Sequence, residues 1–242
     1  MTNFSLYNEK LKKLEYNSEF GRIIDLTDKE NCKNYGLEPT VVDGDFLLEF
    51  ANLIENKPEF ENPKIFESDY FNKKKIYQAQ CGRVVLSSLK KGKRLGLTKR
   101  KPAGWSNNFI VDKSNYFYHQ THILGDQLVK KKASYVRGEF FLGTRYLNAA
   151  PSGDSMKTYE AQVKEVLEKS DSTSICYRVV PIFNGQEVAP RGVRMTAKSK
   201  EQNDLEFDIF IFNVYPEYAI NYMTGKVTKE ILEGNTDKKE HT

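Results

Sequence analysis

The sequence has few cysteines, few histidines and no long apolar run, and each shortage excludes a class of protein. No apolar stretch of the 242 residues reaches the roughly 18 residues that a membrane-spanning helix needs. Three widely spaced cysteines (Cys32, Cys81 and Cys176) make neither a disulfide framework nor a C-x-x-C metal pair, so we expect buried free thiols, with one bridge still open if the protein is exported. Aromatic residues make up 12% of the chain, which excludes a disordered or fibrous protein.

The first 20 residues contain no apolar core of the kind found in signal peptides. The sequence therefore leaves two alternatives, an intracellular protein or the mature part of a secreted one. Residues 230–242 form a polar tail, in which His241 is a poor candidate for chemistry.

Acidic residues are absent from one long segment, although the net charge of the chain is only +4. Residues 1–72 hold 8 basic and 15 acidic side chains, whereas residues 73–101 hold 11 basic side chains and no acidic one. A segment without counter-charge attracts a polyanion, and nucleic acid is the first to consider. The alternative is a solvated basic loop, but a second cluster at Lys130, Lys131, Lys132 and Arg137 favours a nucleic-acid partner.

Sequence patterns predict a mixed α+β fold with a central antiparallel sheet and flanking helices. Residues 43–56 are dense enough in apolar side chains for a short core helix, and residues 158–169 have one apolar face with a helical period. We expect strands over 75–89, 109–111, 115–121, 175–183, 192–199 and 205–216, with a turn and strand near 224–227. The basic residues 90–105 contain three glycines and a proline, which favours a loop.

Two of the three histidines, His119 and His122, form an H-x-x-H pair. Residues three apart on a strand point to opposite faces, so the pair is a poor zinc site. Histidines of this kind are usually ordinary strand residues. Only the polar residues that follow at 145–148 and 159–160 favour a catalytic role for this pair.

The stretch from residue 104 to about 225 resembles the DNA/RNA non-specific endonucleases of the ββα-metal (His-Me finger) class. It is most similar to the secreted streptococcal DNases (streptodornases, phage-encoded ones included) and the pneumococcal DNA-entry nuclease. The likeness rests on the order of several motifs: GW at 104–105, THILGDQL at 121–128, GTRYLN at 143–148, YE at 159–160, YRVVPIF at 177–183, PRGVRM at 190–195, FNVYP at 212–216 and NYMTG at 221–225.

This resemblance implies a ββα-metal finger and a Mg²⁺-dependent endonuclease with little sequence specificity, with Mn²⁺ or Ca²⁺ as substitutes. His122 matches the general base that activates water, Asn148 matches the metal ligand, and Glu160 matches the acid that orients metal-bound waters. The expected products carry a 5′-phosphate and a 3′-hydroxyl. Without the resemblance, Asn148 would be a turn residue, and Glu160 would form a surface pair with Lys164.

Basic residues are the candidates for contacts to phosphate. Binding through such contacts is expected to weaken with added salt and to depend little on the base sequence of the nucleic acid. The candidates are Arg145, Arg137, Lys90, Lys91, Lys93, Arg94, Lys99, Arg100 and Lys101. The substrate is DNA, with cleavage of RNA left open.

One departure from the family concerns the motif Asp-Arg-Gly-His, whose last residue matches His122. This chain has His119-Gln120-Thr121-His122 in its place, so what orients the His122 ring is open, and we expect His119 to be a bystander. Two alternatives follow, a non-catalytic nucleic-acid-binding module derived from a nuclease and a zinc hydrolase with another substrate.

The expected organisation is a single nuclease domain over residues 1–242. It comprises an acidic part (1–72), a basic strand and loop (73–101), a nuclease core (104–225) and the polar tail. The resemblance also implies an extracellular setting, and we expect a monomer without a membrane partner.

Overall fold

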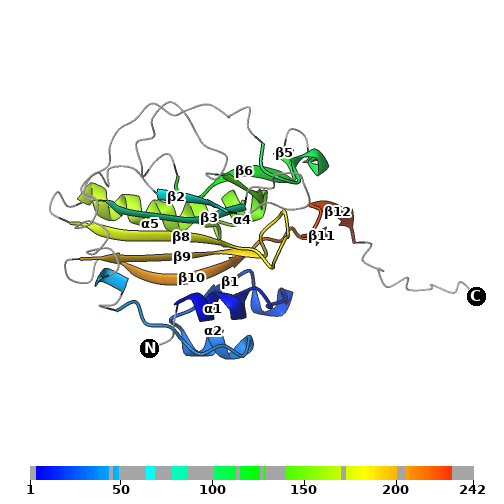
Figure 1. The fold of residues 1–242 in the computed structure, drawn as a ribbon. Coiled ribbons are helices and arrows are strands. Elements are labelled where there is room, and N and C mark those ends of the chain that lie inside the picture. The colour runs from blue at the N-terminus through cyan, green and yellow to red at the C-terminus, as the bar shows by residue number, and fades with distance from the viewer. Residues whose placement is uncertain are drawn as a thin grey trace, which may run out of the picture.

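The computed structural model describes residues 4–43, 46–48, 64–68, 78–86, 101–112, 115–125, 128, 140–169, 173–200 and 205–230. It contains a six-stranded antiparallel sheet in the order β1-β10-β9-β8-β3-β2, with helices and two-stranded hairpins around it (Figure 1). The predicted mixed α+β fold with an antiparallel sheet is confirmed. No helix among the described residues is both long and apolar enough to cross a bilayer.

The centre of the sheet is the predicted meander of long strands. These strands are β8 (Ile175–Ile182), β9 (Gly192–Ser199) and β10 (Glu206–Phe212), and β3 (Gln78–Leu86) pairs with β8. Nearly all residues of β8, β9 and β10 are buried, and their β-branched and aromatic side chains fit a pleated surface that is covered on both faces.

The edges of the sheet come from the acidic N-terminal part, where no strand was predicted. Strand β1 (Ile23–Asp25) pairs with β10, and β2 (Lys64–Ser68) pairs with β3. A strand of three residues is too short to show an alternating pattern, so β1 is not predictable from its own residues.

Helix α5 (Met156–Lys169) covers one face of the sheet. Its buried Val163 and Leu167 pack in a cluster with Ile209 and Ile211 of β10, and Tyr159 and Val166 pack against that cluster. The helical face predicted over residues 158–169 is therefore confirmed.

The opposite face of the sheet is covered by the N-terminal helices α1 (Phe4–Leu11) and α2 (Lys29–Asn34). Leu11 and Cys32 pack in a second cluster with Phe210 and Phe212, which alternate along β10 with the residues facing α5. In Figure 1 these two helices lie together beside β1 and β10, away from α5.

Part of the expected helix at 43–56 is also described. Residues 46–48 are helical, Phe46 packs with Val42 and Cys176 in a small third cluster, and the remainder of this prediction lies outside the described residues. The three cysteines are buried and free, as expected.

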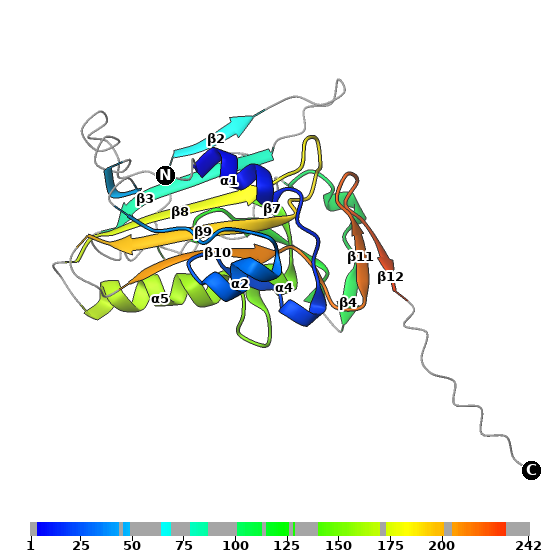
Figure 2. The ribbon, with the colours of Figure 1, turned by 90° about the horizontal axis from the view of Figure 1, so that it is seen from below.

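Smaller strands gather at one end of the sheet. The pairs β4 (Ile110–Asp112) with β5 (Asn115–Tyr116), β6 (Tyr118–His122) with β7 (Phe140–Thr144), and β11 (Tyr218–Asn221) with β12 (Lys226–Lys229) each form a hairpin. An aromatic cluster built on Phe117 and Tyr118 joins them. Figure 2 shows β4 beside β11 and β12 at this end.

Candidate active site

The hairpin β6–β7 carries both strand histidines and directs them to different partners. In the antiparallel register His119 lies opposite Gly143, and His122 lies opposite Phe140. The ring centroids of His122 and Phe140 are 4.7 Å apart at 53°, whereas the Nδ1 atom of His119 lies 3.0 Å from the Nδ2 atom of Asn148. The two imidazoles therefore diverge, as the period of a strand predicts.

Helix α4 (Arg145–Ala149) follows β7 directly and presents Asn148. Its N-cap is Thr144, whose hydroxyl oxygen accepts a hydrogen bond from the Leu147 amide at 3.0 Å. The side chain of fully buried Asn213 accepts from the Thr144 amide at 2.8 Å and donates to the Leu142 carbonyl at 3.0 Å. The start of α4 is therefore fixed to the end of β10.

His119 is partly buried between the hairpin and α4. Burial lowers the pKa of its imidazole below the ordinary value, and the positive charge of Arg145 lowers it further. The neutral ring is thus favoured at neutral pH, and a neutral imidazole has one nitrogen that can accept a hydrogen bond.

Glu160 lies on the face of α5 that points into the protein and is only 9% exposed. Its Oε1 atom accepts a hydrogen bond from the Gly125 amide at 3.0 Å. Burial, followed by the charge of Glu160, raises the pKa of Tyr177 well above its ordinary value, so this hydroxyl stays protonated near the carboxylate. Because Gly125 is three residues after His122, Glu160 is tied to the segment that follows the candidate base.

Of the predicted phosphate contacts, the structure describes Arg145 and Lys101. Arg145 is the first residue of α4, three positions before Asn148. The Lys101 ammonium lies 4.5 Å from the centroid of the Trp105 ring, a cation–π contact. The other candidates lie outside the described residues: Arg137, Lys90, Lys91, Lys93, Arg94, Lys99 and Arg100.

Sequence reasoning gave no role to two residues that contact this region, His119 and Arg22. The guanidinium of Arg22 donates to the Tyr146 carbonyl and to the Ser152 hydroxyl, each at 3.0 Å, and lies 4.9 Å from the centroid of the Tyr146 ring. Each contact joins residues more than 25 positions apart, so neither contact leaves a pattern in the sequence. The only sequence feature that could have indicated a role for His119 is its place at the Asp position of the family motif.

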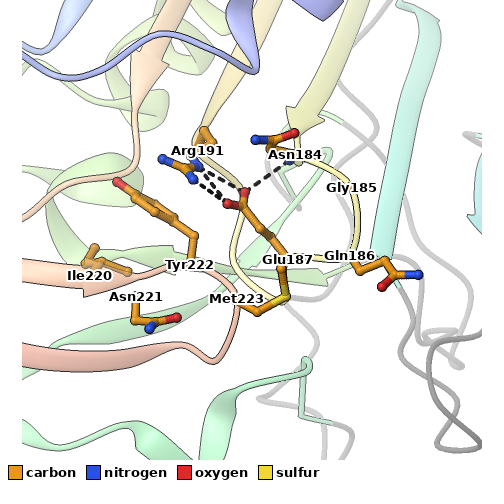
Figure 3. Close-up of a pocket in the computed structure, with 9 residues that line it drawn as sticks. All are labelled: Asn184, Gly185, Gln186, Glu187, Arg191, Ile220, Asn221, Tyr222 and Met223. Carbon is orange, nitrogen blue, oxygen red and sulfur yellow. Dashed lines mark hydrogen bonds and ion pairs between the residues drawn. The ribbon is translucent and has the colours of Figure 1, made fainter.

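A hollow of about 720 Å³, which none of the candidate residues lines, lies between the β8–β9 connection and the β11–β12 hairpin (Figure 3). In it the Arg191 Nε donates to Glu187 at 2.8 Å, and the guanidinium lies 4.5 Å from the centroid of the Tyr222 ring. Burial raises the pKa of Tyr222 to about 12. Because Glu187 already neutralises Arg191, we do not assign phosphate binding to this hollow. It is lined by Asn184, Gly185, Gln186, Glu187, Arg191, Ile220, Asn221, Tyr222 and Met223.

Among the candidate residues, Asn148 offers an oxygen ligand for a divalent cation. Asn148 offers an amide oxygen, since its Nδ2 is directed to His119, and oxygen is the donor that Mg²⁺ prefers. Within the described ranges, no three His, Cys, Asp or Glu side chains form a group that could hold a metal ion.

Comparisons with known proteins identify the family of this chain. The family model of the DNA/RNA non-specific endonucleases matches residues 72–201, just over half of the chain. The chain therefore belongs to this family, and its class is that of hydrolases acting on phosphodiester bonds. A comparison with curated protein sequences gives no significant match.

Solved structures share the fold at low sequence identity. NucA from Streptococcus agalactiae with a magnesium ion bound is similar over 70% of this chain and 80% of its own, with a TM-score of 0.57 and 18% identity. The Sda1 nuclease with a bound zinc ion is similar over 70% and 82%, with a TM-score of 0.56 and 17% identity. NucA without metal is similar over 78% of this chain and 98% of its own, with a TM-score of 0.53 and 17% identity.

Proposed function

We propose that this protein is a Mg²⁺-dependent endonuclease that hydrolyses DNA with little sequence specificity. The main support for this proposal is the unit β6–β7–α4, in which the hairpin that bears the histidines leads directly into the helix that presents Asn148. This unit lies within the segment that the family model matches. In this proposal the unit is the ββα-metal finger, and residues 104–225 are the nuclease core. The magnesium-bound NucA structure, which shares the fold, supports the choice of cation.

His122 is the general base in this mechanism. A neutral imidazole accepts a proton from water near neutral pH, since an ordinary imidazole titrates near pH ~6.5. The resulting hydroxide attacks the phosphorus in line with the leaving 3′ oxygen, which gives a 5′-phosphate and a 3′-hydroxyl. His122 thus removes the proton that would otherwise make water a poor nucleophile.

Asn148 would hold the cation through its amide oxygen, and Glu160 would orient water around it. When bound, the cation supplies Lewis-acid relief of the negative charge that grows on the phosphate and the leaving oxygen. Arg145, Arg137 and the basic residues between 90 and 101 attract and hold the phosphate backbone, which makes binding blind to base sequence.

The setting that we propose is extracellular, as for the streptodornases, with degradation of host or environmental DNA as the role and a monomer as the acting form. This part of the proposal is supported by the motif resemblance.

Plasmid digestion tests the proposal. We expect the wild-type protein to degrade plasmid in the presence of Mg²⁺ and to be inactive when EDTA is added. We expect His122→Ala to bind DNA but to cleave it at least about 100-fold more slowly. His241→Ala, which removes the histidine of the polar tail, is the matched control and should cleave normally. DNA retardation without cleavage at any metal concentration would instead favour the alternative, a non-catalytic binding module.

A further inference from the structure

The contact between His119 and Asn148 sets the orientation of an amide. An amide NH₂ group only donates hydrogen bonds, so at 3.0 Å the Asn148 Nδ2 donates to the His119 Nδ1. The terminal torsion of an Asn side chain is otherwise broad and nearly two-fold, and the oxygen and nitrogen can exchange places. Fixing the nitrogen on the ring directs the Oδ1 atom away from His119.

The backbone around this contact is itself fixed. His119 lies in the register of β6 opposite Gly143, and α4 packs against both strands of the hairpin. A Cβ atom on Gly143 would lie 2.4 Å from the Thr121 hydroxyl oxygen and 3.1 Å from a Leu147 methyl group, so the hairpin and helix meet closely at this glycine. The distance between the ring and the amide is therefore set by regular secondary structure.

We propose that His119 is a positioning residue, which holds the Asn148 amide with its oxygen presented to the divalent cation. This inference rests on the proposed function, which makes Asn148 the ligand. Counting back from His122, His119 stands where the family motif has Asp, and both side chains offer an acceptor atom to the amide NH₂. In this role His119 acts through Asn148 and not on the substrate.

The test measures binding of Mn²⁺ to the full chain without DNA, by loss of the free Mn²⁺ signal in electron paramagnetic resonance. His119→Leu removes the acceptor and should weaken Mn²⁺ binding about tenfold or more, while circular dichroism shows a folded protein. His119→Asp restores an acceptor and should return the affinity to within about threefold of wild type, a rescue that a purely structural role does not predict. His241→Ala is the control and should bind Mn²⁺ normally.

The outcomes separate this inference from the proposed function. Normal Mn²⁺ binding by folded His119→Leu, together with loss of binding by Asn148→Ala, would overturn the positioning role alone. Normal binding by Asn148→Ala would overturn the ligand assignment itself.

A second measurement needs no variant at the contact. Long-range ¹H–¹⁵N correlation spectra of the wild type report which ring nitrogen of His119 carries the proton. We expect the proton on Nε2, leaving Nδ1 as the acceptor. A neutral His119 ring with its proton on Nδ1 would overturn the inference even if His119→Leu fails to fold.

Discussion

At the scale of single residues, the close approach of Gly125 to Glu160 explains why a glycine stands three positions after His122. A Cβ atom at this position would lie 2.4 Å from one carboxylate oxygen of Glu160 and 2.6 Å from the other. Rotation of the carboxylate away from a new Cβ atom would cost the hydrogen bond that its Oε1 accepts from the Gly125 amide. The glycine therefore makes room for an acid that the proposed mechanism uses.

Gly125→Ala should destabilise the protein by about 1–3 kcal/mol, since it overpacks a buried site. It should also lower the cleavage rate, because Glu160 must move. Urea unfolding of Gly125→Ala, Glu160→Ala and the double variant measures the coupling. In the Glu160→Ala background the same glycine substitution should cost less than about 0.5 kcal/mol; an equal cost in both backgrounds would show that the clash lies elsewhere.

At the scale of elements, α4 is held from two sides. Thr144 and Asn213 fix its first turn to the end of β10, and Arg22, which precedes β1 and lies outside the matched residues 72–201, binds the carbonyl of Tyr146. A five-residue helix has little stability of its own, so its position depends on such contacts.

Arg22→Ala should loosen α4. The loss of two hydrogen bonds from a guanidinium and of its contact with the Tyr146 ring predicts a decrease of about 1–2 kcal/mol in the free energy of unfolding. Hydrogen exchange of the amides at 145–149 should accelerate, and plasmid cleavage should slow. Arg22→Lys keeps the positive charge but lacks the planar guanidinium that donates both hydrogen bonds, so its loss of stability should lie between those of the wild type and Arg22→Ala. Unchanged exchange in α4 would show that the helix does not depend on Arg22.

Some of these elements are predictable from the sequence and others are not. The strands β8, β9 and β10 follow from runs of β-branched and aromatic residues between turns, and the buried face of α5 follows from its helical period, because each element is long enough to display its pattern. The three-residue β1 is not predictable in this way, and its place in the sheet depends on pairing with β10. For the site, the motifs indicated Asn148 and Glu160, but the contact of Asn148 with His119 exists only once the hairpin has closed across residues 123–139. Side-chain contacts made by closing a long connection leave no local pattern in a sequence.

At the scale of the whole molecule, the acidic N-terminal part has a structural explanation that its charge did not suggest. Its apolar residues Tyr7, Leu11, Ile24 and Leu26 are buried in the cluster on the second face of the sheet. Burial of that face removes Phe210 and Phe212 from water. Among residues 4–43, the acidic side chains other than Asp25 are exposed, so this charge lies on the solvent side of a covering layer whose apolar side stabilises the sheet.

This arrangement predicts that the stability of the nuclease depends on α1, which lies outside residues 72–201. Leu11 is fully buried, so Leu11→Ala should lower the free energy of unfolding by about 2–5 kcal/mol through lost burial and a residual cavity. Leu6 lies on the same helix but is 61% exposed, and Leu6→Ala, the matched control, should change it by less than about 0.5 kcal/mol. Urea unfolding measures both, and plasmid cleavage below the transition should match the wild type in each, since neither side chain belongs to the proposed site. Equal stability of the two variants would mean that α1 does not contribute to the folded sheet, and the acidic part would then be an appendage to the nuclease.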